Sequence, residues 1–393
     1  MKIAMIGHKA IPSTRGGIET VLTNICPLIA ARGNEVVCYN RTADRPEKEY
    51  ERDIVNGEYK GVKLKKARTL KIKGISAMLA SFSAALACSF TKCEIVHFHA
   101  EGPSAAMVIP KLFGKKCVAT VHGLDWQREK WGSGFASKYI KHGERTLVKH
   151  ADAVIVLSQS AQQYFKQTYG RKTVIIPKGI SRPKLLSDDI IKEKYGLFKE
   201  SYICMVARLT KEKGAHYLIE AYKRLDTDKK LVICGDTSDT DEYVAELKKL
   251  AGDNENIIFT GFISGDTLGQ IYSNSYAVCL PSDLEGMSIS LLEALSYSNA
   301  VLCSDIPENT SVCGDAALTF KKGNVDDLTQ KLDFLLKNPQ EAKMLREISA
   351  EYVLSRFSWE QTAKKTAELY EEILKDKKGG NDRCRTKTEC GRR

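Results

Sequence analysis

The stretch Tyr202-Ile203-Cys204-Met205-Val206-Ala207-Arg208-Leu209-Thr210-Lys211-Glu212-Lys213-Gly214 decides the fold, because an apolar run passes directly into a cationic turn. The start of the stretch predicts a buried strand. The cations Arg208 and Lys213 follow that strand, and a helical pattern covers His216–Arg224. A strand that leads through a short loop into a helix is the repeating unit of a parallel α/β sheet.

The same alternation extends outward from this stretch in both directions. The predicted strands are Lys2–Ile6, Glu35–Tyr39, Glu94–His97, Lys116–Val121, Ala153–Leu157, Tyr202–Val206, Lys230–Cys234, Ile257–Phe259, Ala277–Leu280 and Ala300–Ser304. The predicted helices are Glu19–Arg32, Ile75–Phe90, Ser137–Lys149, Ala161–Tyr169, His216–Arg224 and Asp241–Ala251. We therefore expect an α/β protein with two Rossmann-like, doubly wound parallel sheets. Ligands are expected in a cleft between the two, at the carboxyl ends of the strands.

The length of the chain, 393 residues, exceeds one ordinary core and suits two domains. The pattern restarts near Ile176–Arg182, which predicts an N-terminal domain at 1–178 and a C-terminal domain at 179–357. Ser358 followed by Gln361 forms a capping-box pattern. We expect a final helix over 358–375 that crosses back toward the N-terminal domain, and a basic flexible tail at 376–393.

Charge and cysteine content narrow the function classes. The net charge of +11 favours an anionic partner such as a nucleotide phosphate, an anionic lipid or a nucleic acid. Twelve cysteines occur without any Cys-x-x-Cys pair, and several of them, including Cys204 and Cys279, lie in apolar runs. Buried free thiols behave as small hydrophobic groups, and disulfides are rare in the cytoplasm. We therefore expect a reduced, cytoplasmic protein.

A basic segment precedes an uncharged one. Lys60–Lys73 contains seven cations, and residues 74–91 contain no charged side chain. The uncharged segment approaches the roughly 18 residues of a membrane span. However, it is rich in serine and alanine, and its large residues, such as Ile75 and Phe82, recur at helical spacing, which favours a helix packed within a domain. The cations leave two interpretations open: docking on the inner face of a membrane, or a solvated loop.

Two further segments could carry chemistry. Gly16 and Gly17 follow the first strand and precede a helix, so they either let the backbone approach an anion or form a tight turn. Glu285 and Glu293 lie eight residues apart, in a loop and in the following helix. A carboxylate such as Glu293 among leucines needs a partner, which is either a sugar hydroxyl or a nearby Lys or Arg. Arg208 and Lys213 suit a diphosphate, or are ordinary surface cations.

Metal-binding patterns are weak. The run Asp236-Thr237-Ser238-Asp239-Thr240-Asp241 resembles an acidic metal loop but lacks the glycine and final glutamate of a calcium loop. It is better interpreted as a polar loop in which Thr240 or Asp241 caps a helix. His97 and His99 share a strand face, and without a third ligand they are expected to line a cleft or to support the fold. We expect no bound metal.

Together these motifs resemble the retaining glycosyltransferases of family four, which have the two-domain GT-B fold. The matching parts are Gly16-Gly17-x-Glu19, His122-Gly123, Arg208 with Lys213, and Glu285-x7-Glu293, and the resemblance runs from Met1 to about Leu374. It implies a retaining, metal-independent transfer from a nucleotide-diphosphate sugar, with no other cofactor. The N-terminal domain would then hold the acceptor, and the C-terminal domain the nucleotide sugar.

The resemblance also implies roles for the matching residues. Two fixed cations would neutralise the leaving diphosphate, one glutamate would accept hydrogen bonds from the ribose, and the other would hold the hexose. The implied donor-binding residues are Gly16, Gly17, Arg208, Lys213, Glu285, Gly286, Met287, Ser288 and Glu293; the implied catalytic residues are His122, Arg208, Lys213 and Glu285; Glu19 lies on the acceptor side.

A narrower resemblance points to biological role. Pro12-Ser13-x-x-Gly16-Gly17-x-Glu19 and the strand end Cys38-Tyr39-Asn40-Arg41 are similar to bacterial transferases that build surface polysaccharides. The acceptor would then be a glycan or a polyprenyl-diphosphate-linked sugar, and the sugar transferred a hexose or deoxyhexose. Two alternatives stay open, a sugar-nucleotide 2-epimerase of the same architecture and a basic nucleic-acid-binding protein. The second rests on charge alone, without a recognisable reader motif.

Overall fold

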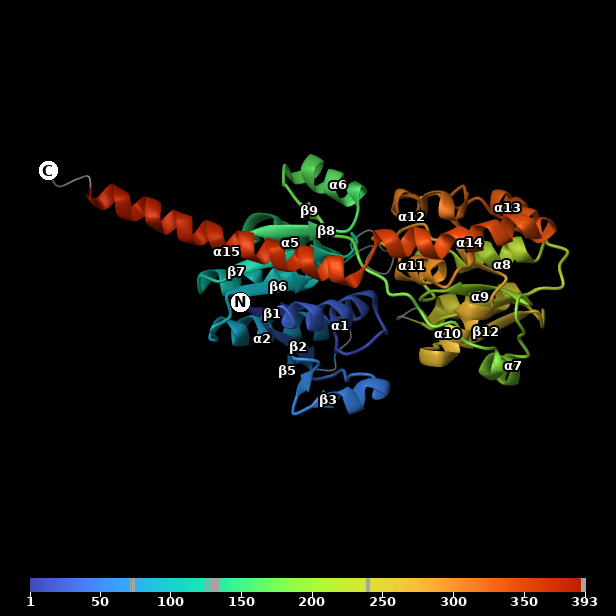
Figure 1. Cartoon of the computed structure of the whole chain (residues 1–393), viewed down its shortest axis with the longest axis horizontal. Coiled ribbons are helices and arrows are strands. Elements are labelled where there is room, and N and C mark those ends of the chain that lie inside the picture. Colours follow the sequence, from blue (N-terminus) through green and yellow to red (C-terminus); the bar gives the residue numbers. More distant parts are fainter. Residues whose placement is uncertain (71, 73–74, 125, 127–133, 238–240, 390–393) are drawn as a thin grey trace. The chain divides into compact units, whose positions relative to one another are not determined.

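The computed structural model of the chain describes residues 1–70, 72, 75–124, 126, 134–237 and 241–389, with side chains as far as Lys375. The chain forms two compact units, shown in Figure 1. Unit 1 contains Met1–Gly179 together with Trp359–Arg393, and unit 2 contains Ile180–Ser358. Each unit is an α/β layer structure around its own sheet, as the alternating sequence pattern predicts.

The sheet of unit 1 is parallel from β5 to β9 and ends in an antiparallel edge at β3 and β4. Its strand order in the described chain is β3-β4-β5-β2-β1-β6-β7-β8-β9. The strands are β1 (Lys2–Ile6), β2 (Glu35–Arg41), β3 (Ile54–Val55), β4 (Glu58–Tyr59), β5 (Val62–Ala67), β6 (Ile95–His99), β7 (Lys116–Val121), β8 (Ala153–Val156) and β9 (Val174–Ile175).

Strand β5 corrects the interpretation of the basic segment as a solvated loop. Val62 and Ala67 are buried, whereas Lys63, Lys65 and Lys66 are exposed. The strand pairs in parallel with β2 over its whole length. Lysine-rich strands are compatible with a position near a sheet edge, because their charged ends reach water while the apolar residues pack inward. Lys71 and Lys73 of the same segment lie outside the described residues.

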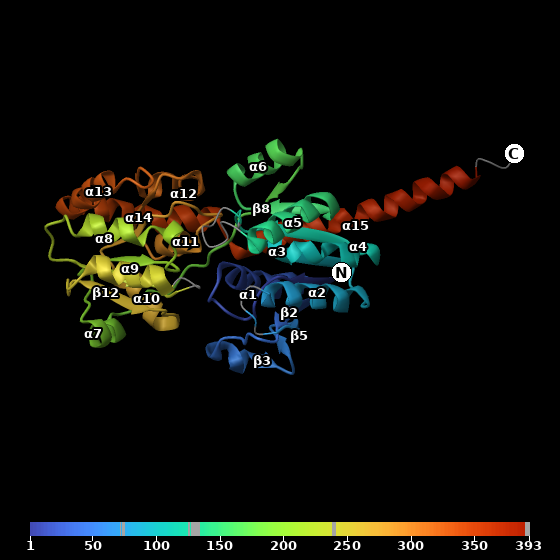
Figure 2. The same cartoon turned by 180° about the vertical axis from the view of Figure 1, so that it is seen from behind.

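Helices cover both faces of this sheet. Figure 1 shows α1 and α15 on one face, and Figure 2 shows α2, α3 and α4 on the other. The helices are α1 (Gly17–Ala30), α2 (Ser76–Ser89), α3 (Glu101–Ser104), α4 (Val108–Leu112), α5 (Phe135–His150), α6 (Gln159–Tyr169) and α15 (Trp359–Glu389), with 3-10 turns η1 (Lys48–Asp53) and η2 (Ala105–Met107).

The last helix, α15, packs against α1, so the end of the chain completes unit 1 as predicted. Tyr370 on α15 is fully buried, and its hydroxyl lies 2.6 Å from Nδ1 of His97 on β6. Thr362 donates a hydrogen bond of 2.9 Å to the carbonyl of Pro177. The helix continues to Glu389, beyond the predicted end at Lys375. The flexible-tail prediction for 376–393 stays a prediction.

Helix α2 forms where predicted, but its packing corrects the expectation for its large residues. Phe82 and Leu86 are 40% and 49% exposed, and Ile75 at the start of the helix is 38% exposed. The buried face consists of small residues such as Ala84 and Ala85. Periodicity identified the helix correctly but did not tell which face is covered, because both faces are free of charge.

Unit 2 has a fully parallel sheet in the order β12-β11-β10-β13-β14-β15. Its strands are β10 (Tyr202–Val206), β11 (Lys230–Cys234), β12 (Ile257–Gly261), β13 (Ala277–Leu280), β14 (Ala300–Ser304) and β15 (Leu318–Phe320). Its helices are α7 (Asp189–Tyr195), α8 (Ala215–Tyr222), α9 (Asp241–Ala251), α10 (Gly265–Asn274), α11 (Ile289–Ser296), α12 (Pro307–Cys313), α13 (Val325–Lys337) and α14 (Pro339–Arg356), with 3-10 turns η5 (Lys211–Lys213) and η6 (Gly314–Ala316).

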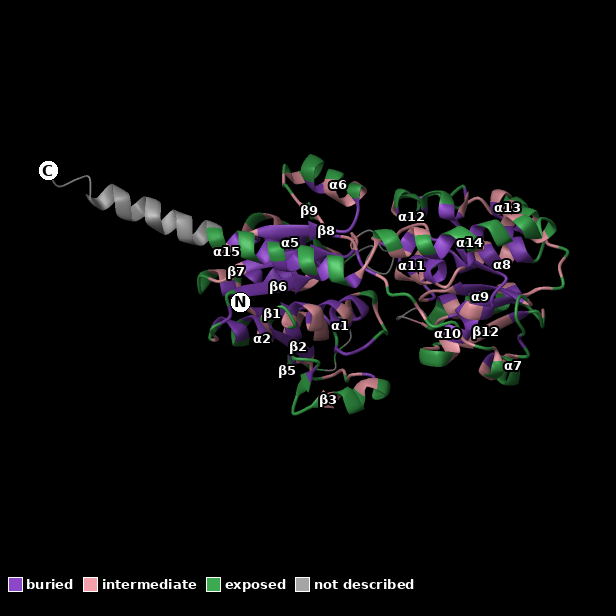
Figure 3. Cartoon of the chain, viewed as in Figure 1, coloured by how far each residue is buried: buried purple, intermediate pink, exposed green. Residues whose placement is uncertain are grey.

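The strands of both sheets are largely buried, as Figure 3 shows. The ten cysteines whose side chains are described are free and buried, in agreement with their interpretation as small core residues. In a doubly wound sheet the ligand binds outside the carboxyl ends of the strands, where the strand order reverses. That point lies between β10 and β13 in unit 2 and between β1 and β6 in unit 1.

Candidate active site

The reversal point of unit 2 carries a buried ion pair between two predicted site residues. Lys213 follows β10 and Glu285 follows β13, and Nζ of Lys213 lies 2.5 Å from Oε1 of Glu285. The same oxygen accepts a hydrogen bond of 2.9 Å from the hydroxyl of Ser282. The side chains of Lys213 and Glu285 are only 14% and 9% exposed. The two loops that leave the central strands therefore meet through charge at the expected ligand position.

Backbone contacts fix the two loops against each other. Gly214 has φ +71°, and a Cβ there would lie 2.0 Å from the carbonyl oxygen of Pro281. The position therefore requires glycine both for its conformation and for the close approach. The amide of Asp283 donates to the carbonyl of Glu212 at 2.8 Å. Tyr217 donates from its hydroxyl to the carboxylate of Asp283 at 3.1 Å.

The other predicted residues of these loops lie close by in sequence but have different local roles. Arg208 lies two residues beyond β10 and is partly buried. Its carbonyl accepts a hydrogen bond of 2.9 Å from the amide of Thr210. Met287 is 3% exposed. The hydroxyl of Ser288 accepts from the amide of Leu291 at 3.3 Å and so caps α11.

The cap leaves the first amides of α11 available. Backbone amides in the first turn of a helix have no acceptor within the helix. Gly286, partly buried, lies just before this helix, in the loop that carries Glu285. A helix N-terminus near a cation is a favourable place for a phosphate group. The loop after β13 therefore supplies amide donors, and the loop after β10 brings the ammonium group of Lys213 to it.

Glu293 lies on α11, and its carboxyl group is held by Tyr272. The Tyr272 hydroxyl donates to Oε2 of Glu293 at 3.2 Å, and the Tyr272 ring stacks on Tyr297 with centroids 5.2 Å apart. Burial raises the pKa of Glu293 to about 7. Within the described residues Glu293 forms no ion pair, so the interpretation as a Lys- or Arg-paired helix residue is wrong. Sequence reasoning did not identify Tyr272, which lies on a different helix.

In unit 1, the predicted glycine turn forms the N-terminus of α1. Gly16 precedes the helix without a side-chain cap, and Gly17 is its first residue. A Cβ on Gly16 would lie 2.2 Å from Oε2 of Glu19. The other oxygen of Glu19 accepts from the amide of Lys9 at 2.8 Å. Gly16 therefore makes room for a carboxylate that braces the loop after β1, and the acceptor-side role of Glu19 stays a prediction.

Buried histidines line the reversal point of unit 1. His8 follows β1, His97 and His99 belong to β6, and His122 follows β7; each is at most 9% exposed. Nδ1 of His99 lies 3.1 Å from Nε2 of His122, and the rings of His97 and His99 have centroids 4.2 Å apart. His97 and His99, which were expected to support the fold or to line a cleft, therefore form one cluster with His122.

Three of these histidines, His8, His97 and His99, favour the neutral form. Burial lowers the pKa of His8 to about 4 and that of His97 to about 3, and it also lowers the pKa of His99. His8 hydrogen-bonds the side chain of Asn40 at 2.9 Å, a residue that sequence reasoning did not place here. Among the described residues, no group of three or more His, Cys, Asp or Glu is arranged to hold a metal ion. Residues 238–240 of the acidic loop lie outside the described residues.

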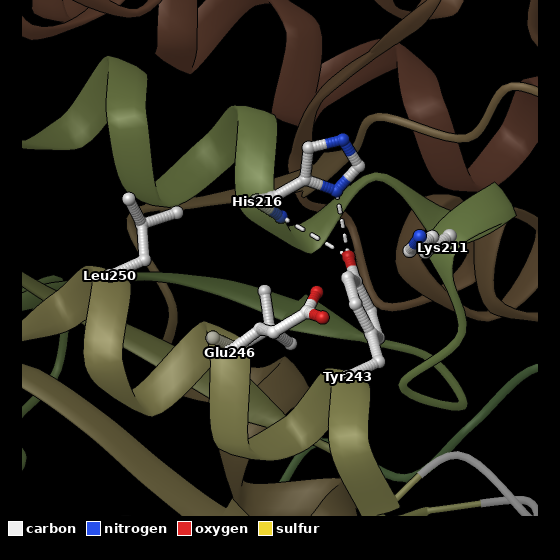
Figure 4. A pocket seen from close by; sticks show the side chains of 6 residues that line it. Lys211, His216, Tyr243, Glu246 and Leu250 are labelled. Carbon is white, nitrogen blue, oxygen red and sulfur yellow. Dashed lines mark hydrogen bonds between the residues drawn. The ribbon is translucent and has the colours of Figure 1, made fainter.

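A cavity of about 380 Å³ adjoins the Lys213 loop. In Figure 4 the side chains of His216 and Tyr243, which help to line it, point toward each other, with Nδ1 of His216 2.7 Å from the tyrosine hydroxyl. The lining residues are Lys211, His216, Tyr243, Glu246, Leu247 and Leu250. The residues predicted for the donor do not line this cavity, which makes it a useful reference position for variants.

Comparisons with known proteins define the class. Residues 15–182 match Glycosyltransferase Family 4, and residues 187–352 match Glycosyl transferases group 1. These matches span most of both units, and the chain belongs to the family-four-type glycosyltransferases, as predicted. The α-maltose-1-phosphate synthase of Mycolicibacterium smegmatis is 25% identical over 77% of this chain and 85% of its own length.

Solved structures show the same fold. Sucrose-phosphate synthase from Thermosynechococcus elongatus aligns with a TM-score of 0.81 over 95% of this chain and 99% of its own, at 18% identity. Anabaena HepE, solved with UDP-glucose, aligns with a TM-score of 0.77 over 95% of this chain and 100% of its own, at 16% identity. The fold is therefore GT-B, and the chain is a glycosyltransferase.

Proposed function

We propose that this glycosyltransferase moves a hexose or deoxyhexose from a nucleotide-diphosphate sugar to a glycan or a polyprenyl-diphosphate-linked acceptor, with retention of anomeric configuration and without a metal. The observation that carries the proposal is the Lys213–Glu285 pair at the reversal point of unit 2, beside the N-terminus of α11. The UDP-glucose bound by HepE supports a nucleotide-sugar donor. The α-maltose-1-phosphate synthase relative supports a sugar substrate.

The ion pair gives the donor site a simple chemistry. A diphosphate that enters beside Lys213 competes with Glu285 for the ammonium group, because both are anions. When Lys213 turns to the diphosphate, Oε1 of Glu285 keeps its hydrogen bond from Ser282 and can accept a second one from a hydroxyl of the sugar. Arg208 and Lys213 then stabilise the negative charge that develops on the leaving diphosphate. A fixed cationic pair supplies the charge that a metal would otherwise provide.

Glu293 is suited to the ribose. As a carboxylate it accepts two hydrogen bonds from vicinal hydroxyls, and the Tyr272 hydroxyl holds it in place. Gly286, Met287 and Ser288 would present backbone groups to the hexose in the same loop. In unit 1, the imidazole of His122 would hydrogen-bond a sugar hydroxyl, and the amides of Gly16 and Gly17 would face a phosphate group.

The biological setting is part of the same proposal. The similarity of the N-terminal turn to bacterial surface-polysaccharide transferases supports a role in polysaccharide synthesis with cytoplasmic donors. Incubation with the nucleotide sugar alone distinguishes the 2-epimerase alternative from a transferase, because an epimerase changes the nucleotide sugar without an acceptor. A transferase releases free nucleotide diphosphate only when an acceptor, or slowly water, receives the sugar. The nucleic-acid-binding alternative rests on the net charge of +11 alone.

A thermal-shift panel with UDP-, GDP-, dTDP- and ADP-sugars tests the proposal. One nucleotide class is expected to stabilise the wild type, by about 2.7 kcal/mol at a donor concentration a hundred times the dissociation constant. Glu293→Ala should lose most of this shift, because the ribose contact is absent. Tyr243→Phe, in the neighbouring cavity, is the matched control and should retain it. Stabilisation by none of the donors, or equal stabilisation of Glu293→Ala, would refute the assigned site.

A further inference from the structure

Helix α2 is built with its large apolar residues facing water. Ile75, Phe82, Leu86 and Phe90 follow one another at helical spacing and are 38%, 40%, 49% and 72% exposed. The opposite face carries small residues, of which Ala80, Ala84, Ala85 and Cys88 are buried at 4% or less. A surface helix of a water-soluble domain usually shows the reverse arrangement. The exposed stripe therefore requires an explanation other than the core of unit 1.

The short helix α4 extends this stripe into a wider surface. Helices α2 and α4 pack against each other (Figure 2). Phe113, just after α4, contacts Phe90 with ring centroids 4.9 Å apart and is 46% exposed, and Leu112 is 80% exposed. A contiguous apolar patch of this kind marks an interaction site on a soluble protein. We define the α2–α4 patch as Ile75, Phe82, Leu86, Phe90, Leu112 and Phe113.

Positive charge borders the patch on one side. Strand β5 packs beside α2, and the hydroxyl of Ser83 donates to the carbonyl of Arg68 at 2.9 Å. Lys63 and Lys65 share the α2-covered face of the sheet with Ala67, and both are exposed, as is Arg68 just after the strand. Residues 60–73 contain no acidic side chain, and residues 74–91 contain no charge at all. Lys63 is partly neutralised by Glu35 at 3.1 Å, whereas the other cations extend the positive surface.

We propose that the α2–α4 patch docks unit 1 on an anionic lipid surface. The apolar stripe enters the boundary between headgroups and acyl chains, and the β5 cations contact anionic headgroups, as in interfacial amphipathic segments. The bordering charge selects this occupant, because a purely apolar partner surface would offer nothing to the β5 cations. Within the described residues, no helix is both long and apolar enough to cross a membrane, so the patch describes a helix lying along the surface rather than a span.

The docking surface narrows the acceptor, a consequence that rests on the proposed function. A transferase held at a lipid surface meets acceptors that carry a lipid anchor, which favours the polyprenyl-diphosphate-linked sugar over a free glycan. The docking itself requires neither donor nor acceptor. Its failure would therefore leave the transferase proposal intact, and failure of the donor panel would leave the docking proposal intact.

Vesicle flotation of the full chain tests the docking. Wild-type protein is expected to bind vesicles of phosphatidylcholine with phosphatidylglycerol, and to bind phosphatidylcholine vesicles about tenfold less or worse. The double variant Leu86→Ser/Leu112→Ser should weaken binding to the anionic vesicles by about tenfold or more, because it removes buried apolar area from the interface. Lys65→Gln/Arg68→Gln should weaken it by several-fold and reduce its sensitivity to salt. These residues are exposed, so the variants are expected to fold normally.

Unit 2 offers the matched control. Met344 is 50% exposed on α14, and Met344→Ser should bind vesicles like the wild type. Equal binding of the wild type to neutral and anionic vesicles would overturn the proposal, as would wild-type binding by the two double variants. A dimer in solution that Leu86→Ser/Leu112→Ser abolishes, without vesicle binding by the wild type, would assign the patch to a second copy of the chain and would also overturn it.

Discussion

The two units have the same order of central strands, but the side chains at the point where that order reverses are charged in unit 2 and neutral in unit 1. In unit 2, the loops after β10 and β13 meet in the Lys213–Glu285 ion pair. In unit 1, the corresponding strands β1 and β6 lead to His8 and His99, which are buried and neutral. Strand order alone therefore predicts where each unit presents its ligand-facing side chains, and the residue types decide what chemistry is possible there.

The difference matches the two kinds of substrate that a glycosyltransferase handles. A diphosphate is anionic and is stabilised by fixed cations, which unit 2 supplies. A sugar hydroxyl is neutral and is recognised by groups that donate or accept hydrogen bonds, which neutral imidazoles do without a charge to compensate. The same difference makes the stability of the two units respond differently to acid, to substitution and to ligand.

The largest expected effect is selective acid unfolding of unit 1. The pKa values of His8, about 4, and His97, about 3, lie below the 6.5 of an unfolded histidine. The neutral form is favoured by folding, so this stabilisation is complete above pH 6.5 and is lost as the pH falls toward 4. Each unit of pKa difference corresponds to about 1.4 kcal/mol, so the total loss reaches several kcal/mol.

Tryptophan fluorescence can follow this loss in unit 1, since Trp126, Trp131 and Trp359 all fall within its residue ranges. Hydrogen exchange of the β10 and β11 amides reports on unit 2 in the same samples. His97→Gln, which cannot titrate and can retain hydrogen bonds to Tyr370 and Thr120, should lower the pH of the fluorescence transition; exposed His142→Gln should not. Loss of both units at one pH, or no shift with His97→Gln, would contradict the assignment.

The second effect concerns the ion pair of unit 2. Lys213→Met should lower the free energy of unfolding by about 3 kcal/mol, because it leaves the carboxylate of Glu285 buried without its cation. Lys213→Met/Glu285→Gln should recover most of that loss. The kcat of glycosyl transfer should stay low in this double variant, since loss of a charge-stabilising group typically lowers kcat by about 10²- to 10³-fold. Urea unfolding and initial rates measured together separate the two roles, and a double variant with restored kcat would show that the pair is structural only.

Much of the fold follows from local sequence. Strands such as β10 and β13 form at the predicted residues, because short apolar runs bounded by turn residues have few alternatives in an α/β chain. Strand β5 was not predicted as a strand, since its three lysines hid an alternating pattern that only the neighbouring strand β2 makes favourable. The spacing of apolar residues also could not show that the large residues of α2 face outward, because it identifies a helix face but not what covers that face.

The candidate site, like the fold, could be predicted from the sequence only in part. Arg208, Lys213 and Glu285 could be predicted because they directly follow strands whose carboxyl ends lie together in a parallel sheet. The pairing of Lys213 with Glu285 depends on the close approach of Gly214 to Pro281, a tertiary contact. The buried histidines His8, His97, His99 and His122 come from three separate stretches of the chain, at β1, β6 and β7. Only His122 was assigned to the site beforehand, through the family resemblance.

The third effect compares two glycines with similar backbone conformations. Gly214 has φ +71° and Gly170, in unit 1, has φ +64°. Gly170→Ala should cost about 1 kcal/mol of stability from the left-handed conformation alone, because no atom lies within 4 Å of its Cβ. Gly214→Ala should cost about 2 kcal/mol or more, since its Cβ would meet the carbonyl of Pro281 and push the two loops apart. Equal losses in chemical denaturation would mean that the loop contact adds nothing.

The smallest effect is a pH dependence located at Glu293. Its pKa, about 7 in the folded unit and 4.5 in an unfolded chain, means that folding favours the protonated form. The residue therefore destabilises unit 2 progressively as the pH rises from about 4.5 to above 7, and its partial exposure limits this penalty to about 1–2 kcal/mol at pH 8.

Glu293→Gln, which retains the contact with Tyr272, should then be more stable than the wild type at pH 8 and equal to it near pH 4.5. Donor binding should follow the opposite trend, because only the carboxylate can accept from both ribose hydroxyls. The donor affinity of the wild type is expected to rise as the pH increases through 7, and that of Glu293→Gln to stay low and flat. Glu347→Gln, 66% exposed on α14, is the control for a general charge effect. A wild-type affinity that does not change between pH 6 and 8 would place the ribose contact elsewhere on unit 2.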